Sequence, residues 1–546
     1  MANLPVRNIG KAGLMMDNEP WDEPWEAWSS GTNIRFDDGK AQRAPIFRTF
    51  TTAASSTLLS GVGGVISYRP YSGFDVSYFI DQSGRIQQAP VTAATPDASG
   101  PGYVPVVGTA QFTTAHLADC LYVNRESGVP RVLTPGATTF VPVPNWPTSY
   151  TAQVVRALSS FAVAFNITKG PTQYGNMVKW SDAVSAGAAA SAWDPTVTTS
   201  LAGENLLSQM DGPILDANNL GAGMLIYSSR QCWAMEPTGD KTFLFNFRKL
   251  WEEPRWGVWT RNCALEVEGQ HYVFGQGDMY VHDGVSRPQS IASGKIRKFV
   301  YSNMIAAQAS KFFVCHDPFS TSVLFCFVSQ DKDVVFKNPT FCNKAAVYNY
   351  LNGTWGLMEL PNIGGATLAN ANYLVPWAGD TKPWALSGGA WLDQADSAKT
   401  ALLMAGDALG PQLPAPTIYA LDPIFRYSRI SLPFDPYANS PAYLEHGGIS
   451  LDLAGMPLQH YKRVRRIDLQ ARVLAGGPIT VSIGASPQSV AAPVYTTSQY
   501  VYDPAVTDFI PSSATGRYLA LRIDAPANCE FDVTGFDLDV IPGGKR

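Results

Sequence analysis

A short strand, a tight turn and a second short strand recur along this chain. One such unit runs through residues 76–87 (VSYFIDQSGRIQ), another through residues 120–133 (CLYVNRESGVPRVL) and a third through residues 271–284 (HYVFGQGDMYVHDG). Each joins two aromatic or β-branched runs across Gly, Asp or Asn, which is typical of a β-hairpin. Repeated hairpins predict a repeat architecture, which favours a scaffold or a binding surface over a pocket for chemistry.

The spacing of these units predicts a β-propeller. Marks at the centre of each first strand fall near Phe79, Tyr122, Ala164, Ile226, Val273 and Val314. Most steps between marks are about 41–47 residues, the size of a four-stranded blade, so we expect about six blades, with five or seven left open. The step after Ala164 is longer and contains the Ala/Ser/Gly-rich stretch 183–191. We therefore expect an insertion between blades near residues 181–222, with a short helix over residues 203–209.

Three regions differ in composition and predict the domain organisation. Residues 1–54 form an N-terminal arm and a hairpin at residues 33–45 (NIRFDDGKAQRAP), and residues 55–430 form the propeller. A Pro/Gly/Ala-rich region at 360–415 is too long for a compact blade and predicts a protrusion, which ends in a strand beginning at Thr417. Residues 431–546 lose the period and carry about five alternating strands, which predict a C-terminal β-sandwich-like domain.

Two clusters of special residues have an ordinary structural interpretation that we favour. The N-terminal arm carries Trp21, Trp25 and Trp28. Packing in a core or a subunit interface is favoured for them over a sugar-stacking platform. The local basic cluster consists of Lys462, Arg463, Arg465 and Arg466. A solvated strand face is favoured for this cluster over a contact with nucleic acid or a partner.

Composition and charge exclude several classes of protein. Only 16% of residues are charged, and 47 Gly and 40 Pro accompany 12% aromatic residues, which is typical of tightly connected β-sheet. The net charge of −5 argues against a protein that coats DNA. Seven cysteines without a CxxC pair predict a reducing compartment rather than a disulfide framework. With no apolar signal core and no membrane-length apolar run, we expect a soluble protein made in the cytoplasm.

Motifs for catalysis or cofactor binding are not found in the sequence. There is no dinucleotide-binding glycine motif, Walker loop, His-Glu-x-x-His or nucleophile elbow. His271 and His282 flank one hairpin and could approach each other, and a metal site would need Asp278 or Asp283 as a further ligand. Cys315 and His316 are neighbours, so on a strand they point to opposite faces. We therefore predict no catalytic, cofactor-binding or metal-binding residues.

Paired carboxylates are the serious enzymatic alternative, because glycoside hydrolysis needs two carboxyl groups at a fixed separation. The acidic candidates are Asp37, Asp38, Asp81, Asp278, Asp283, Glu252 and Glu253. Most lie at expected turns, where aspartate commonly caps its own backbone. The segment 349–355 (NYLNGTW) is similar to the end of the aspartate-box turn of sialidase-type propellers, but it lacks the Ser-x-Asp opening. We therefore expect a protein that is not an enzyme.

An ordered series of motifs resembles the tail nozzle proteins (tail tubular protein B-like) of short-tailed bacteriophages. The series begins with residues 33–45 and covers roughly residues 30–360. It continues through KWSD (179–182), LAGE (201–204), DGPI (211–214), MLIY (224–227), CWAM (232–235), FNFRKL (245–250), RNC (261–263) and GDMYVHDG (277–284). Each motif alone is a β-turn with an aromatic neighbour, and the order makes the series more specific. The C-terminal third has no matching motif.

The resemblance implies a structural virion protein: a β-propeller-containing subunit of a homohexameric ring. Such a ring would lie below the portal and contact the phage adaptor ring, carry tail fibres or spikes, and conduct double-stranded DNA through its lumen without specific binding. A slightly negative lumen would repel phosphate and avoid tight contacts. The Trp-rich arm and residues 360–415 are the candidates for subunit contact or channel gating. The alternative is a carbohydrate-binding or glycoside-hydrolysing β-propeller that acts on bacterial surface polysaccharide; a scaffold propeller with a cellular partner also stays open.

Overall fold

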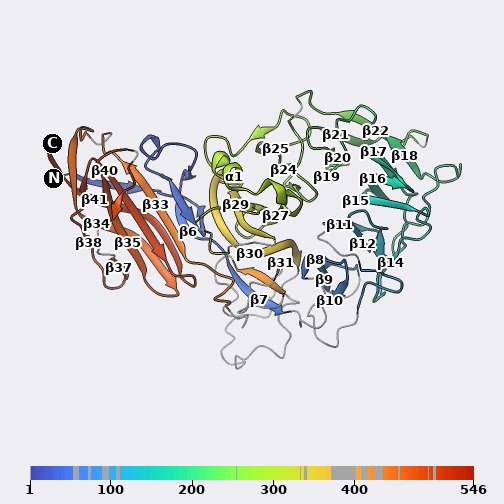
Figure 1. Ribbon diagram of the computed structural model, residues 1–546, viewed down its shortest axis with the longest axis horizontal. Coiled ribbons are helices and arrows are strands. Elements are labelled where there is room, and N and C mark those ends of the chain that lie inside the picture. Colours follow the sequence, from blue (N-terminus) through green and yellow to red (C-terminus); the bar gives the residue numbers. More distant parts are fainter. Residues whose placement is uncertain are drawn as a thin grey trace.

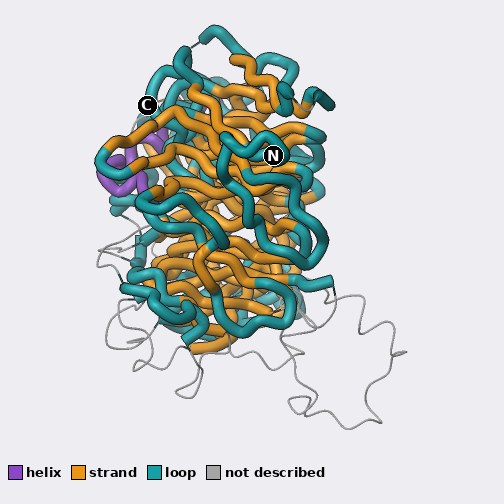
Figure 2. The backbone as a smooth tube through the Cα atoms, turned by 90° about the vertical axis from the view of Figure 1, so that its right-hand side faces the viewer, coloured by secondary structure: helices purple, strands orange, loops and turns teal. Residues whose placement is uncertain are grey.

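The structure of the 546-residue chain is a computed structural model. It describes residues 2–52, 61–71, 76–88, 97–105, 111–240, 242–253, 255–332, 334–336, 341–369, 401–407, 416–422, 434–452, 455–489, 491–495 and 500–545. It is 53% strand and 4% helix, which confirms the prediction of an all-β fold. The helical segments of the described chain are α1 (Arg297–Asn303), η1 (Pro20–Asp22) and η2 (Ala306–Lys311). Figure 2 shows how little of the backbone is helical.

A series of small antiparallel sheets occupies the middle of the chain, and within each sheet the strands lie in chain order. The first holds β8 (Val62–Tyr68), β9 (Val76–Asp81) and β10 (Ile86–Gln88). The second holds β11 (Phe112–Leu117), β12 (Cys120–Arg125), β13 (Arg131–Leu133) and β14 (Val141–Pro142). The third holds β15 (Tyr150–Leu158), β16 (Phe161–Lys169), β17 (Thr172–Trp180) and β18 (Gly203–Leu206).

The series continues with three further groups of strands. The fourth sheet holds β19 (Asp216–Leu220), β20 (Gly223–Tyr227), β21 (Cys232–Pro237) and β22 (Phe245–Lys249). The fifth holds β23 (Ala264–Val267), β24 (Gln270–Phe274), β25 (Met279–His282) and β26 (Gln289–Ser290). The sixth group is β27 (Phe313–Asp317), β28 (Ser322–Phe327), β29 (Cys342–Asn349) and β30 (Thr354–Ala369), and it belongs to a larger sheet.

The first strands of these six groups contact one another in chain order. Strand β8 contacts β11, and the contacts then run from β11 to β15, β19, β23 and β27 in order. The sixth group closes the series, because β30 contacts β8. Figure 1 shows the groups succeeding one another around the right-hand part of the molecule. The contacts between the six groups therefore form a closed series.

The predicted position of each first strand is wrong for five groups. Five of the six marked residues lie on the second strand of their group: Phe79, Tyr122, Ala164, Ile226 and Val273. Val314 alone lies on a first strand. The true first strands have weaker sequence signals. Strand β8 contains Gly63 and Gly64, and β19 reads DANNL, so neither resembles an aromatic or β-branched run. Pairing with the second strand fixes them instead.

The predicted insertion lies within a sheet instead of between sheets. Residues 181–202 connect the third and fourth strands of the third sheet, and the predicted helix at 203–209 is wrong because Gly203–Leu206 forms β18. The connection packs inward: Ala190 and Trp193 are buried, and the Trp193 ring lies 4.8 Å from the ring of Trp146. Burial of these side chains fixes the segment against the second and third sheets.

The region at 360–415 is partly regular in the residues that the structure describes. Strand β30 continues through Ala369, and its second half pairs with β31 (Ala401–Gly406). Strand β31 pairs with β32 (Thr417–Asp422), which confirms the strand predicted at Thr417, and β32 pairs with β7 (Ile46–Thr52). Residues 370–400 and 408–415, where the protrusion is expected, lie outside the described residues.

The two ends of the chain build a two-sheet region together, at the left of Figure 1. One sheet holds β33 (Ala442–Ile449), β35 (Ile479–Ser486), β36 (Val494–Tyr495), β37 (Tyr500–Tyr502), β40 (Tyr518–Ala525) and the N-terminal strand β4 (Ser30–Thr32). The other joins β34 (His460–Ala475) and β41 (Glu530–Lys545) to β1 (Ala2–Arg7), β38 (Ile510–Pro511) and β39 (Thr515–Gly516). We call this region the terminal sandwich. Strands β1 and β4, which fall in the predicted N-terminal arm, therefore pair with C-terminal strands.

The hairpin predicted at residues 33–45 is confirmed as β5 (Ile34–Asp37) and β6 (Lys40–Arg43). Its turn residues Asp38 and Gly39 have φ of +48° and +73°, which suits a two-residue hairpin loop. Strand β5 also pairs with β30, and β6 pairs with β41. The hairpin thus connects the sixth group of strands to the terminal sandwich.

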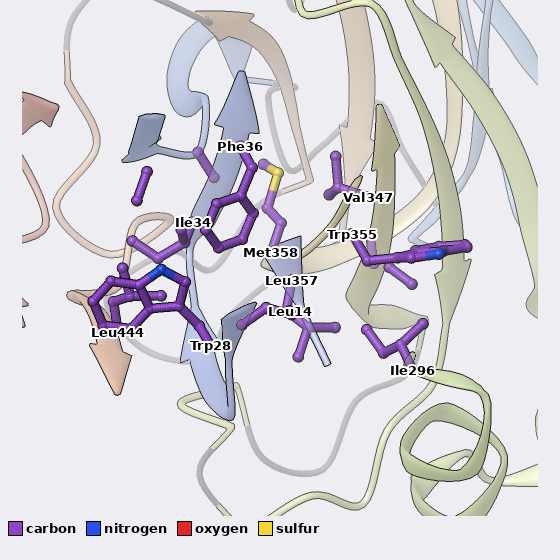
Figure 3. Packing of buried hydrophobic residues seen from close by; sticks show 14 of the residues in the cluster. Leu14, Trp28, Ile34, Phe36, Ile296, Val347, Trp355, Leu357, Met358 and Leu444 are labelled. Atoms are coloured by element: carbon purple, nitrogen blue, oxygen red, sulfur yellow. The ribbon is translucent and has the colours of Figure 1, made fainter. Parts of the chain in front are cut away.

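One continuous core spans this connection (Figure 3). Trp28 and Leu444 lie on the side of the terminal sandwich, Ile34 and Phe36 lie on the hairpin, and Trp355 lies on β30. Trp28 and Trp355 are among the largest fully buried side chains of the described residues. Trp28 belongs to β3 (Ala27–Trp28), which pairs in parallel with β2 (Gly13–Leu14). Burial of these large side chains holds the two halves together.

Candidate functional site

A cavity lies where the first strands meet, and its volume is about 270 Å³. We call it the axial cavity. Its walls come from β8, β9, β11, β15, β19, β23, β27 and β30. The polar lining residues are Gln111, Thr114, Arg156, Asn218, Asn262, Ser310 and Lys311, and the large apolar ones include Phe112, Phe313 and Phe341. No acidic residue of the described chain lines it.

Arg156 is the centre of the hydrogen-bond network at this cavity. Its Nε donates to the carbonyl oxygen of Ala217 (2.8 Å), and one terminal nitrogen donates to the carbonyl oxygen of Thr114 (3.2 Å). The other donates to Asp216 Oδ1 (2.7 Å) and to Asn262 Oδ1 (3.0 Å). One side chain on β15 therefore joins its own sheet to the sheets on either side and to the segment before β23.

Asn262 extends the same network toward the other sheets. Its backbone N–H donates to Asp216 Oδ2 (2.7 Å), and its side-chain amide donates to the carbonyl oxygen of Phe112 (2.9 Å). The backbone carbonyl oxygen of Asn262 accepts a hydrogen bond from the backbone N–H of Val314 (2.7 Å) on β27. The left-handed φ of +57° at Asn262 is one that asparagine adopts more readily than most residues. These bonds tie the first strands β11, β15, β19 and β27 to one another and to the segment before β23.

The polar groups at the axial cavity are mostly committed to each other. Both oxygens of the buried Asp216 carboxylate accept hydrogen bonds, and Arg156 compensates its charge. A second buried cation, Arg261, donates to Gln153 Oε1 (2.6 Å) and pairs with Glu126 (3.1 Å), and burial lowers its pKa. Such a network orders the strands, and it offers no pair of carboxylates to a substrate in the cavity.

The two predicted histidines do come together, around a buried tyrosine. His271 and His282 are cross-strand partners, and the Tyr227 hydroxyl lies 2.7 Å from His271 Nδ1 and 2.9 Å from His282 Nε2. His271 Nε2 bonds the carbonyl oxygen of Asn219 (2.8 Å), and His282 Nδ1 accepts the N–H of Gly284 (3.2 Å). His282 thus donates to Tyr227, which donates to His271, and both rings are neutral. All four ring nitrogens are used, which leaves none for a metal.

The burial of these histidines predicts that the protein loses stability in acid. Burial lowers the pKa of His271 and lowers that of His282 to about 3, with the nearby His271 as a further cause. His446, buried against Trp28, has its pKa lowered to about 4 by burial. Because the unfolded chain binds these protons near pH 6.5 and the folded chain does not, stability falls as pH drops below 6.5 toward 3.

Urea unfolding at pH 7 and pH 5 measures this effect. We expect the free energy of unfolding to be lower at pH 5 by about 2 kcal/mol for each fully buried histidine. The slope of the unfolding free energy against pH measures how many more protons the unfolded chain binds than the folded chain. In His282→Gln this number should be smaller by up to one between pH 5 and pH 7. The interpretation is wrong if His282→Gln loses as much stability between pH 7 and pH 5 as the wild type does.

Five of the seven acidic candidates have separate partners in turns or on the surface. Asp81 and Asp283 accept backbone N–H groups of their own turns at 2.7–2.9 Å. Asp278 accepts a serine hydroxyl at 2.9 Å. Glu252 and Glu253 each pair with a basic side chain at 2.9 Å on the surface. None of these carboxylates lines the axial cavity.

The cysteines are buried thiols. All seven are free and buried. Burial raises the pKa of Cys120 and of Cys529 to about 11, so these thiols are protonated at neutral pH. Cys315 is buried, whereas the neighbouring His316 turns to the Tyr350 hydroxyl, 3.3 Å from its Nε2. This arrangement agrees with their expected opposite directions.

The three N-terminal tryptophans have different environments. Trp28 is 1% exposed and donates from Nε1 to the carbonyl oxygen of Ile9 (2.6 Å), and Trp25 packs against the same core. Core packing is therefore confirmed for these two. Trp21, on η1, is half-buried and lines a groove on the terminal sandwich.

Glu23, close to Trp21 in the chain, is a buried carboxyl with no hydrogen-bond partner in the described structure. Burial raises its pKa from 4.5 to about 8, so ionisation costs stability increasingly as pH rises from 4.5 to 8. We expect Glu23→Gln to raise the free energy of unfolding by about 2 kcal/mol at pH 7 and by almost nothing at pH 4. Denaturant titrations at both pH values measure the gain. An equal effect at the two pH values would contradict the assigned cause.

The basic cluster is only partly a solvated face. Arg463, Arg465 and Arg466 are exposed, and Arg466 pairs with Asp468 at 3.0 Å. Lys462 is different, because it is 0% exposed and donates from Nζ to the carbonyl oxygen of Arg517 (3.0 Å). The prediction that Lys462 lies on a solvated face is therefore wrong. The alternation of β34 turns Lys462 inward, on the same side as the core residues of that strand.

Comparison with known proteins adds no identification. No protein-family model matches the chain, and no curated protein matches it. The described residues contain no group of three or more His, Cys, Asp or Glu side chains arranged to hold a metal ion. In the same part of the chain, no helix is long and apolar enough to cross a membrane.

The residues at the axial cavity were not predicted from the sequence. Arg156 follows two valines in the strand Tyr150–Leu158, where an arginine turned inward needs a partner. Asp216 and Asn262 lie in segments that read as turns. Nothing local shows that they meet Arg156, because they are 60 and 106 residues away from it in the chain.

Proposed function

We propose that the chain is a six-bladed β-propeller carried by a terminal sandwich, and that it serves as a structural subunit of a phage tail nozzle. The propeller is supported by the order of the first strands, which runs β8, β11, β15, β19, β23, β27 and returns through β30 to β8. In a propeller the inner strand of each blade surrounds a central channel, and here those strands surround the axial cavity.

The observation that carries the structural role is the network at the axial cavity. Arg156, Asp216 and Asn262 use their polar groups to join neighbouring sheets. Catalysis would need groups with perturbed pKa values directed at a substrate, and the cavity lining holds no carboxylate pair. A rigid body of this kind suits a wall that must keep its shape while DNA passes.

The motifs that resemble tail nozzle proteins fall on neighbouring sheets in this fold. Residues 179–182 end the third strand of one sheet, residues 224–227 and 232–235 lie in the central strands of the next, and residues 277–284 include the third strand of the sheet after that. Each of these motifs therefore lies on or directly beside a strand of a proposed blade.

The proposed assembly is a homohexameric ring in the virion tail. It would contact the adaptor ring on one side, bear fibres or spikes outside, and let double-stranded DNA pass through its lumen. The net charge of −5 supports a conduit, because basic walls would bind phosphate tightly through counterion release. Assembly in the host cytoplasm agrees with seven free buried thiols.

Quantitative mass spectrometry of purified virions tests this role. The nozzle proposal predicts that the chain co-purifies with DNA-filled particles at a fixed number of copies, a multiple of six, and stays with tails after heads are removed. Absence from purified particles, with the chain found only in infected cells, would contradict it. A variable copy number that falls with washing would count equally against it.

A further inference from the structure

A groove of about 320 Å³ lies on the terminal sandwich, where η1 packs against β33. We call it the Trp21 groove. Two aromatic residues, two carboxylates and several hydroxyls lie along it. These residues are Glu19, Trp21, Ser29, Glu445, Ser489 and Tyr518. Glycines at 447 and 448 form part of its wall. The groove shares no lining residue with the axial cavity, and it includes neither His271 nor His282.

Polar groups in the Trp21 groove lack partners within the protein, in contrast to those at the axial cavity. The Trp21 indole N–H, the Tyr518 hydroxyl and the Ser489 hydroxyl make no hydrogen bond within the described residues. The exposed Glu19 carboxylate also makes none there. These atoms are not among the buried polar atoms that lack a partner. They are therefore accessible to solvent or to a ligand. Donors and acceptors therefore stand together beside two aromatic rings.

This combination favours one class of ligand. A cation could pair with the carboxylates, but it could accept nothing from the Trp21 N–H. An anion could accept from the donors, but Glu19 and Glu445 would repel it. A sugar hydroxyl both donates and accepts, and the C–H face of a sugar ring is apolar enough to lie on an aromatic ring. We propose that the Trp21 groove binds a short, neutral saccharide.

The protein holds both sides of the groove in place. Gly448 has φ of +69°, and an added Cβ would lie 2.7 Å from Pro20 C and Trp21 N, so glycine allows the segment that carries Trp21 to approach β33. On β40, the Arg522 guanidinium lies 3.3 Å from Glu445 Oε2 and also pairs with Asp524 at 2.9 Å. Arg522 orients the Glu445 carboxylate and offsets its charge, which leaves Glu19 as the uncompensated acceptor.

The volume suits a small ligand, since it lies at the lower end of the range for small-molecule sites. A shallow site with one or two stacking rings predicts weak binding, with a Kd on the order of 1 mM for a single sugar. Many copies in a ring would strengthen attachment to a polysaccharide by multivalency. The groove itself does not depend on the ring, so saccharide binding and ring formation can fail separately.

Saturation-transfer NMR on the full chain tests this proposal. The probes are the neutral methyl glycosides of glucose, galactose, mannose, rhamnose and N-acetylglucosamine, with tetramethylammonium as the cationic probe. We expect at least one glycoside to bind, and we expect Trp21→Ala to weaken that binding about tenfold or more. Glu19→Gln keeps the shape but removes the charge, and it should weaken binding several-fold.

Phe243→Ala is the matched control, because Phe243 is 72% exposed and lies outside the groove. It should bind like the wild type, and thermal melts of all three variants should match the wild-type melt. The proposal is overturned if no glycoside binds at about 10 mM, if only tetramethylammonium binds, or if Trp21→Ala binds a glycoside as well as the wild type does. A Trp21→Ala variant that melts early is replaced by Trp21→Phe, which keeps a ring but loses the N–H and should bind less tightly.

Discussion

Trp355→Ala is expected to lower the free energy of unfolding by about 3–5 kcal/mol. Trp355 is 0% exposed, and its Nε1 donates to the carbonyl oxygen of Ile291 (2.8 Å). Its ring lies 4.8 Å from that of Tyr348 and 5.7 Å from that of Phe325. The substitution leaves a large cavity and also removes the donor to a carbonyl oxygen.

The position of Trp355 makes the effect global. It lies on β30 beside the hairpin that joins the sixth group of strands to the terminal sandwich (Figure 3). Denaturant unfolding followed by circular dichroism measures the loss. Leu351→Ala is the control, because Leu351 lies nearby in the chain and is 65% exposed, so its change should stay within about 0.5 kcal/mol. Similar losses for the two variants would contradict the assigned core.

Arg156→Met is expected to cost about 3–5 kcal/mol, because it leaves the Asp216 carboxylate buried without its cation. The Asp216 carboxylate is 0% exposed, and Arg156 also bonds two carbonyl oxygens and Asn262. The loss should appear as loosening between the second, third and fourth sheets. Hydrogen exchange of the amides in β11, β15 and β19 should accelerate before that of the terminal sandwich.

A double substitution separates the charge from the rest of the network. Asp216→Asn in the Arg156→Met background removes the uncompensated charge, so part of the lost stability should return. Unfolding free energies of the two single variants and the double variant give the coupling. Two results would show that the buried pair does not hold the sheets together. One is a loss of less than about 1 kcal/mol in Arg156→Met, and the other is a double variant whose loss of unfolding free energy equals the sum of the losses of the two single variants.

Most of what the sequence predicted depends on local signals. The sequence predicts the hairpins around Phe79, Tyr122 and Val273 because the second and third strands carry aromatic and β-branched residues beside a Gly or Asp turn. The hairpin at residues 33–45 was recognised for the same reason, since its turn is Asp38–Gly39. Long alternating strands such as His460–Ala475 also carry a clear period.

The strands that the sequence does not predict depend on pairing between distant residues. Asp216–Leu220 and Gly203–Leu206 are polar or contain glycine, so only their partner strands make them strands. Val6 pairs with Phe536, a match that no local pattern shows. At the axial cavity, the composition suggested no site, and only the fold brings Arg156 to Asp216. The Trp21 groove likewise combines residues that are more than 400 positions apart in the chain.

Electron microscopy of the purified full-length protein tests the central claim most directly. The account predicts closed rings of six copies with an open lumen, and in each copy a disc of radial sheets attached to a two-sheet lobe formed by both chain ends. The result that would contradict it is a protein that stays monomeric in the presence of its adaptor ring. A map in which β8, β11, β15, β19, β23 and β27 do not surround one axis would contradict it as well.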